Sequence, residues 1–441
     1  MSRPAPQADL PLGPLLRLEG LDFDLLPSRD SSIAIITPFV ENLLGESLNF
    51  LASVDAYDIN RGDKRDPSGW KPKGSVKYSG EKDIGGPSEC AIELLEKTIP
   101  KSKLKAAIAK PAAIVPPAGG GDEAGNNEAR VRRSTNPIPE TWACRRSIHN
   151  NEAVGGTASW REFVRYMKIE HVETEREMTP TVPRAQVSQN WVAATLIKHI
   201  ILGESYPAGP RAWTRFTLRI VEMEHDLKQP GFDHRVFPVL QMTCRSVEEE
   251  KKAQFLVISV PINDWKGVAP PDPERADTKV ADGPNITIGS YVSVERFRLV
   301  RKGEDRAAPL KKVEWVMATA SHARGMLPLM IQTPFVPKKI AIDVPLFLKF
   351  MVGARQKAAA APANNALVEE EVTPEAETDP AAYAEREADA YALAFGLIDT
   401  GLQPVANEPV GTPQTGPQTG PQAEPQAAPQ AAPQAGIGGE T

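Results

Sequence analysis

The sequence predicts an α+β fold in which a curved antiparallel sheet packs on a long C-terminal helix. Two patterns support this class. Apolar and polar residues alternate with the two-residue period of a strand in residues 216–220 and 313–320. Apolar residues then recur at helical spacing in residues 340–351. A series of strands that ends in one broadly apolar helix is typical of a sheet covered by that helix.

Other segments supply the remaining elements. Residues 38–55 have the apolar face of an amphipathic helix, and residues 141–149 have strand character. Ser159 is a predicted N-cap of a helix that starts at Trp160 and continues towards Met178. We expect this helix and the N-terminal helix to pack outside the sheet. Residues 254–262 are continuously apolar, which predicts a strand buried on both faces.

In residues 286–300 the alternation changes phase between Val294 and Phe297, which indicates a β-bulge.

Composition divides the chain into three parts. We predict a flexible N-terminal segment over residues 1–29, a domain over residues 30–360, and a disordered tail over residues 361–441 that is first acidic and then rich in Pro-Gln pairs. Residues 106–140 carry too little periodic apolar content to pack, so we expect a disordered insertion within the domain.

Charge is distributed unevenly between the domain and the tail. Residues 361–441 contain thirteen acidic residues and one basic residue, a net charge of −12, whereas the first 360 residues contain fifty basic and forty-four acidic residues, a net charge of +6. This asymmetry suits contact with an anionic membrane surface or contact between tail and domain, but we favour a tail that only improves solubility. We expect no nucleic-acid partner.

The cysteine content and the hydropathy of the chain indicate its cellular compartment. Its three cysteines are odd in number and far apart, so they predict no disulfide framework and fit a reducing compartment. The N-terminus has no signal-peptide core, and no window approaches eighteen uninterrupted apolar residues. We expect a cytoplasmic protein, with peripheral membrane contact as an option.

Three blocks together resemble a known domain. They are Ala-Arg-Gly-Met-Leu-Pro at residues 323–328, which joins the last strand to the C-terminal helix, the predicted hairpin at residues 216–244, and residues 141–149 followed by 156–160. The chain is similar over residues 39–360, with gaps, to an uncharacterised fungal family of START-like (steroidogenic acute regulatory protein-related lipid transfer) domains. The resemblance implies a helix-grip fold with an internal cavity for a lipid or sterol-like ligand, and residues 321–336 as a gate. It implies no activity, because that family has no settled function.

The candidate ligand site combines apolar residues with one arginine. Arg145 and Arg146 are adjacent in a predicted strand, so they face opposite sides of the sheet and one of them faces the interior. An interior arginine could pair with a carboxylate or phosphate of the ligand; equally, both could lie at the surface or pair with an internal acid. The candidate lining residues are Arg146, Trp315, Met317, Met326, Leu327, Ile340, Val344, Phe347, Leu348 and Met351.

The sequence contains no recognisable catalytic or metal motif. It has no phosphate-binding loop, dinucleotide fingerprint or nucleophile elbow. His225, Asp226, Asp233 and His234 flank one turn, but solvated turn residues explain them better than a metal site, so we predict no metal and no cofactor.

We therefore expect the protein to bind or transfer an apolar or amphipathic lipid-like ligand. One alternative is a non-catalytic interaction scaffold whose tail recruits a protein partner. The other is a START-like enzyme acting on an apolar substrate, which we favour less because the sequence nominates no acid or base for it.

Overall fold

A computed structural model shows the fold of the protein. All described residues belong to one compact unit, Met1–Ala366. The second unit, Leu367–Thr441, contains no described residue, and the predicted tail also lies outside the described residues. The described residues are 12–59, 68–108, 137, 139–203, 206, 212–226, 234–247, 253–265, 280–282, 286–301, 312–322 and 339–360.

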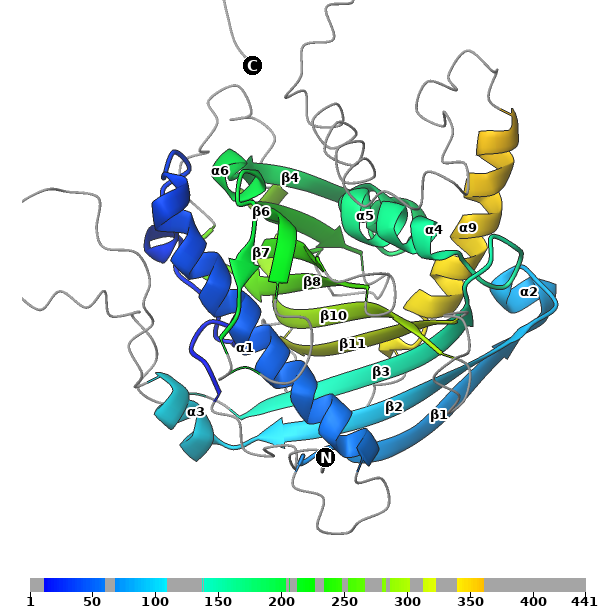
Figure 1. The fold of residues 1–441 in the computed structure, drawn as a ribbon, viewed down its shortest axis with the longest axis horizontal. Coiled ribbons are helices and arrows are strands. Elements are labelled where there is room, and N and C mark those ends of the chain that lie inside the picture. Colours follow the sequence, from blue (N-terminus) through cyan, green and yellow to red (C-terminus); the bar gives the residue numbers. More distant parts are fainter. Residues whose placement is uncertain are drawn as a thin grey trace, which may run out of the picture. The chain divides into compact units, whose positions relative to one another are not determined.

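The centre of the domain is one strongly curved sheet of eleven strands (Figure 1). Nine strands follow the order β1-β2-β3-β11-β10-β8-β7-β6-β4 and pair antiparallel, while β5 pairs with β6 and β9 with β7. The strands are β1 (Lys71–Ser79), β2 (Glu89–Ile99), β3 (Glu140–Asn150), β4 (Arg184–Asn190), β5 (Ile200–Ile201), β6 (Ala212–His225), β7 (Arg235–Ser246), β8 (Gln254–Pro261), β9 (Thr287–Ile288), β10 (Ser290–Val300) and β11 (Lys312–His322).

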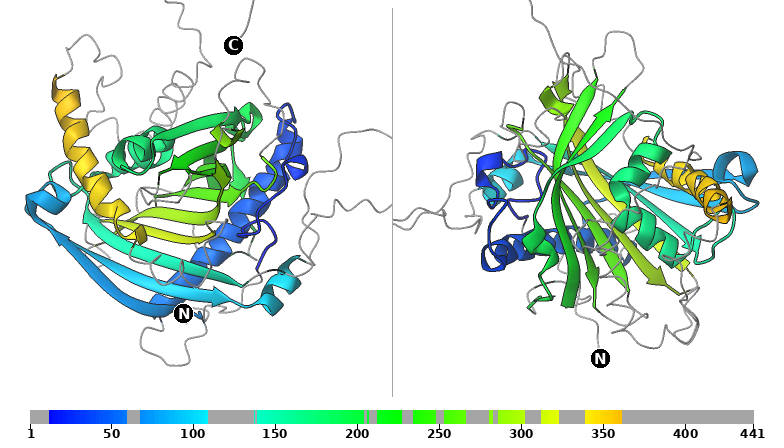
Figure 2. Two further views of the ribbon diagram at one scale, coloured as in Figure 1. Left: turned by 180° about the vertical axis from the view of Figure 1, so that it is seen from behind. Right: turned by 90° about the horizontal axis from the view of Figure 1, so that it is seen from above.

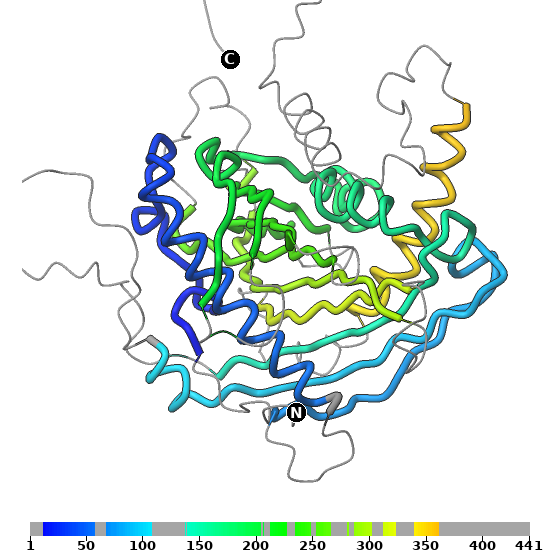
Figure 3. Tube along the Cα trace, in the orientation of Figure 1, coloured from blue at the N-terminus to red at the C-terminus, as the bar shows by residue number. Residues whose placement is uncertain are grey.

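The predicted α+β fold, with a curved antiparallel sheet and a C-terminal helix, is confirmed. Figure 3 shows β3 and β11, from distant parts of the chain, lying side by side at the middle of the sheet.

Helices cover both faces of the sheet (Figure 2). Helix α1 (Ile33–Ile59) packs on one face, here called the α1 face. The other, the α9 face, is covered by α4 (Trp160–Val164), a π-helical turn (Arg165–Ile169), α5 (His171–Met178) and α9 (Asp343–Ala360). The shorter helices are η1 (Phe23–Leu25), α2 (Gly80–Ile84), α3 (Lys101–Ile108), α6 (Val192–Thr195) and η5 (Val280–Asp282).

The start of the chain differs from the prediction. Residues 12–29, expected to be flexible, pack into the core of the α1 face through Leu15, Leu16 and Leu21, which expose 1% of their surface or less. The Arg17 guanidinium also reaches the Glu140 carboxylate, with Nη1 and Oε2 3.0 Å apart. The segment is mostly turn and bend, so its leucines follow no helical or strand period from which packing could be predicted.

The predicted insertion also begins later than residue 106, because α3 continues to Ile108. Almost all of the rest, up to the start of β3, lies outside the described residues, so its disorder stays a prediction.

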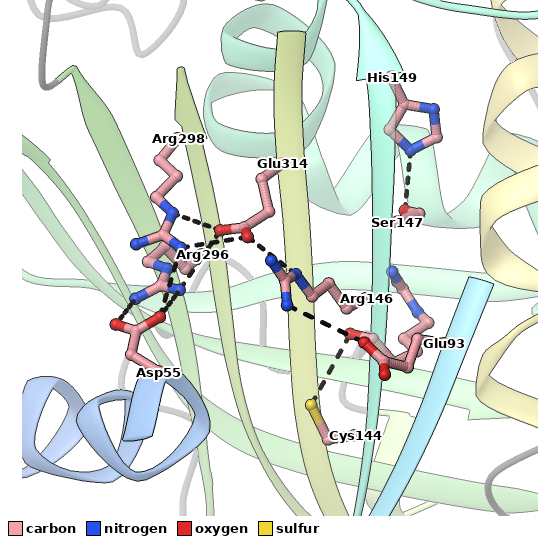
Figure 4. Close-up of polar contacts among 10 residues, drawn as sticks. Asp55, Glu93, Cys144, Arg146, Ser147, His149, Arg296, Arg298 and Glu314 are labelled. Carbon is pink, nitrogen blue, oxygen red and sulfur yellow. Dashed lines mark hydrogen bonds and ion pairs between the residues drawn. The ribbon is translucent and has the colours of Figure 1, made fainter. Parts of the chain in front are cut away.

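Buried ion pairs join α1 to the sheet on the α1 face (Figure 4). Both guanidinium Nη atoms of Arg296 bond the Asp55 carboxylate of α1 at 2.8 Å. Arg296, Arg298 and Arg146 also surround the Glu314 carboxylate, with Arg146 Nε at 2.9 Å from Oε1. Burial alone would raise the pKa of Asp55, but the charge and hydrogen bonds of Arg296, together with the charges of Arg298 and Arg146, outweigh it and hold that pKa well below its usual value. The network therefore holds Asp55 and Glu314 as ionised groups between helix and sheet.

Candidate functional site

The α9 face carries two separate apolar clusters. The aromatic cluster contains Phe255, Phe297 and Trp315 of the sheet, with Phe163 of α4 and Phe347 of α9. Its rings are in direct contact: the centroids of Phe255 and Phe297 lie 4.4 Å apart, and those of Phe163 and Phe347 lie 5.1 Å apart. The second cluster is Val172, Val221, Met223 and Val239, where α5 meets β6 and β7.

The aromatic cluster is a packed core. All five rings have 0% exposure, and Val344, Leu348 and Met351 of α9 are buried against them. Helix α4, expected outside the sheet, belongs to this core because Phe163 contacts both Trp315 and Phe347. Five of the predicted lining residues, those at 315, 344, 347, 348 and 351, thus lie together as an apolar wall.

Between the two apolar clusters lies a band of polar side chains, here called the polar band. One row of it runs straight across five strands, since the residues are directly paired from β11 to β6. Each exposes 5% of its surface or less. The row consists of Thr319, Ser293, Ser259, Gln241 and Arg219. Burying polar groups in mid-sheet is costly unless they are hydrogen-bonded, so this band is not ordinary core.

Much of the polar band is satisfied by its own members. Arg219 Nε donates to Gln241 Oε1 at 3.1 Å. The hydroxyls of Thr217 and Thr243 lie 2.8 Å apart, and Thr319 Oγ1 donates to a backbone carbonyl at 3.0 Å. The band is therefore an ordered part of the fold.

Arg145 occupies the edge of the polar band beside the aromatic cluster. It lies directly opposite Met317, which in turn lies opposite Glu295, so the three side chains form one row on the α9 face. Arg145 Nη2 is 3.7 Å from the Glu295 carboxylate and 3.6 Å from that of Asp343 at the start of α9. Its guanidinium also stacks over Trp315, 4.0 Å from the ring centroid. A buried cation thus stands where polar and apolar surfaces meet.

Several buried polar atoms on this face lack a hydrogen-bond partner among the described residues. They are Nε and Nη1 of Arg145, which is 1% exposed, together with His171 Nδ1 and Thr174 Oγ1 of α5. Leaving a buried donor unpaired costs about 1–3 kcal/mol, so such groups need a particular explanation. A bound polar group would supply the missing hydrogen bonds.

Three carboxyl groups surround Arg145 and have raised pKa values. Burial raises the pKa of Glu175 on α5 to about 8, and the charges of Asp343 and Glu295 add to this. Burial raises the pKa of Asp343 to about 6, although Arg145 acts in the opposite direction. Burial raises that of Glu295 as well, against the opposing charge of Arg145 and the hydrogen bond from Trp315 Nε1 at 2.9 Å. One arginine therefore does not compensate three carboxylates.

The raised pKa of Glu175 predicts how this residue affects the stability of the fold at different pH values. A carboxyl with a higher pKa in the folded state lowers the free energy of unfolding as the pH rises from its ordinary value of 4.5 to about 8. Glutamine mimics the protonated acid, so ligand-free Glu175→Gln should be more stable than wild type at pH 8, with a smaller difference at pH 5. Denaturant unfolding at both pH values measures this. Glu177→Gln, at an exposed position of the same helix, is the control, and identical pH dependence of wild type and Glu175→Gln would contradict the prediction.

Arg146, the arginine predicted to line the site, is on the wrong face. Its side chain projects to the α1 face, where it pairs with Glu314 and Glu93 (Figure 4). Its neighbour Arg145 occupies the interior position instead. Strand alternation required the two to face opposite ways, but the choice between faces depended on which helices cover each side.

The other predicted residues fall into three groups. Met317 is partly exposed in the row of Arg145, and Ile340 is buried just before α9. Met326, Leu327 and most of the predicted gate lie outside the described residues.

Of the turn residues that were considered for a metal site, His234 pairs with Glu224 and His225 packs on Phe237. Within the described part of the chain, no three or more His, Cys, Asp or Glu side chains lie together as metal ligands would. Asp233 is not among the described residues.

Glu295, a site residue that was not predicted, is marked in the sequence by a break in the alternation of apolar and polar residues. The phase change near Glu295 suggested a bulge, yet β10 pairs with β11 in regular register from Ser290 to Val300. The pattern breaks because Glu295 is a charged residue at an inward-facing position. Glu175 and Asp343 gave no such signal, since a helical acid and a helix N-cap acid are common at the surface.

A curved antiparallel sheet packed against a C-terminal helix is the arrangement that the sequence resemblance implied. Residues 142–351 match the model of a family described as a protein of unknown function (DUF3074). No curated protein matches the chain.

Similar solved structures are human StAR-related lipid transfer protein 5 and human STARD10. The first has 11% identity and a TM-score of 0.33, and the match covers 70% of this chain and 96% of that one. The second has 8% identity and a TM-score of 0.32, with 71% and 85% covered. Among the described residues, no helix is long and apolar enough to cross a membrane.

Proposed function

We propose that the protein binds an amphipathic, lipid-like ligand between the α9 face of the sheet and helices α5 and α9. The polar end of the ligand lies at Arg145 and its apolar part follows the adjacent apolar walls. Binding is non-covalent, and removal of apolar ligand surface from water, at about 25 cal/mol per Å², supplies most of the affinity.

The observation that carries the proposal is the set of unpartnered polar atoms inside the domain. Arg145 is buried, yet its Nε and Nη1 atoms have no hydrogen-bond partner in the part of the chain that the structure describes, and the same holds for His171 Nδ1 and Thr174 Oγ1 of α5. Small-molecule sites combine apolar walls with a few convergent polar groups, and the polar band beside the aromatic cluster has this composition.

Met317 offers a direct test because it lies between Arg145 and Glu295 and is partly exposed. The full-length protein is stripped of lipid and titrated with decanol, a neutral amphipathic probe, by calorimetry and native mass spectrometry. We expect one bound molecule per chain, and Met317→Trp should weaken binding at least about tenfold, equivalent to roughly 1.4 kcal/mol.

Met317→Leu is the matched control and should bind within about twofold of wild type, because the volume changes little. Circular dichroism verifies that both variants are folded. Failure of the wild type to bind decanol would favour the interaction scaffold, and equal binding by a folded Met317→Trp variant would contradict the proposed position of the ligand.

A further inference from the structure

The charges around Arg145 bear on the chemistry of the ligand. The guanidinium lies close to two carboxyl groups, Glu295 of β10 and Asp343 of α9, and within electrostatic range of a third, Glu175 of α5. The closest nitrogen–oxygen distances to Glu295 and Asp343, 3.7 and 3.6 Å, exceed those of a hydrogen-bonded ion pair. The arginine is outnumbered, and its own donors are still unpaired.

These groups differ in how far they are exposed. Arg145 exposes 1% of its side chain, Glu295 7% and Asp343 28%, and Glu175 is partly exposed. A ligand whose polar end enters between α5 and α9 therefore meets the two acids of those helices first and Arg145 deeper inside. The charge of Asp343 on α9 contributes to the raised pKa of Glu175 on α5.

We propose, building on the ligand-binding function above, that the ligand is a long-chain amino alcohol. Its protonated amine pairs with Glu175 and Asp343, and its hydroxyl oxygen accepts a hydrogen bond from the unpartnered donors of Arg145. The amine supplies the positive charge that the cluster lacks, and the hydroxyl supplies the missing acceptor.

An anionic head group fits this site poorly. The interior arginine was expected to attract a carboxylate or phosphate, but Glu295 and Asp343 already occupy its surroundings. An anionic group would compete with Glu295 and Asp343 for Arg145, and its charge would further oppose the ionisation of these two carboxyl groups, whose pKa values are already raised. A simple alcohol satisfies Arg145 but leaves the carboxylates uncompensated.

The pH dependence of binding distinguishes an amine from other ligands. Charged or titratable groups on the elements around the site include Arg145, Glu175, His171, Arg219, Tyr291, Glu295 and Asp343, and Tyr78, Cys90 and His149 also interact electrostatically with Asp343 or Arg145. Since burial raises the pKa of Glu175 to about 8, an incoming ammonium must displace its proton at lower pH. Alkylamines stay protonated in this range, as lysine does, so amine affinity should rise from pH 6 to pH 8.

Four probes that share a ten-carbon chain test the proposal: 2-aminodecan-1-ol, decylamine, decanol and decanoate. Calorimetry on the full-length protein at pH 8 should show decylamine binding at least about tenfold tighter than decanol and 2-aminodecan-1-ol tighter still, with decanoate weakest. In Glu175→Gln, the preference for amine over alcohol should fall to about threefold or less, and the rise with pH should disappear. Glu177→Gln, also on α5, should behave as wild type.

The outcomes separate this inference from the proposed function. Decanol binding without an amine preference overturns the amino alcohol and leaves ligand binding intact. Equal affinity for decylamine and 2-aminodecan-1-ol overturns the role of Arg145 towards the hydroxyl. Failure of all four probes overturns the proposed function itself.

Discussion

Arg296→Met is expected to lower the free energy of unfolding by about 3–5 kcal/mol, one of the two largest effects expected for this protein. Arg296 bonds both oxygens of Asp55 at 2.8 Å and also pairs with Glu314. Methionine has a similar length but no charge, so the change leaves Glu314, 2% exposed, with less compensation inside the protein. Stability falls because an uncompensated buried carboxylate is costly.

Denaturant unfolding at pH 7 measures this loss. Lys357→Met is the control, because Lys357 pairs with Glu177 at the surface and is 77% exposed. Exposed ion pairs contribute about 0–1 kcal/mol, so the control should lose no more than that. A loss below about 1 kcal/mol for Arg296→Met would show that the network does not join α1 to the sheet as described.

Phe347→Ala is expected to have the second large effect and to lower the free energy of unfolding by about 3–5 kcal/mol. Phe347 is fully buried, stacks on Phe163 with centroids 5.1 Å apart, and meets Trp315 edge-on at 5.6 Å. Removing the ring leaves a cavity between α9 and the sheet that rigid aromatic neighbours cannot fill. A residue that lined an open ligand space would lose much less.

Phe350→Ala on the same helix is the matched control. Its ring is only partly buried and contacts Tyr166 at 5.3 Å, so its removal should cost about half as much or less. Thermal and denaturant unfolding compare the two variants. Similar losses in both would mean that the aromatic cluster is looser than its packing indicates.

The sequence predicted elements with a clear period and missed packing that has none. The strand at residues 313–320 and the C-terminal helix were identified because their apolar residues repeat at two and near four positions. The leucines of residues 12–29 follow no period, so their burial could not be read from the pattern.

The same limit affected the candidate site. Period and alternation located its apolar wall, including Trp315 and Phe347, but an apolar wall and a packed core have the same sequence pattern. The acids around Arg145 come from positions 175, 295 and 343, which only the folded chain brings together. Contact of the domain with a membrane and recruitment of a partner by the tail stay predictions.

Photochemical cross-linking tests the location of the ligand most directly. The full-length protein is incubated with a decanol analogue that carries a diazirine near its hydroxyl, irradiated, digested and analysed by mass spectrometry. We predict that the modified residues lie on the α9 face, on the peptides of β3, β11, α5 and α9 around Met317. Saturable modification confined to α1 and the α1 face, with none around Met317, would contradict the account.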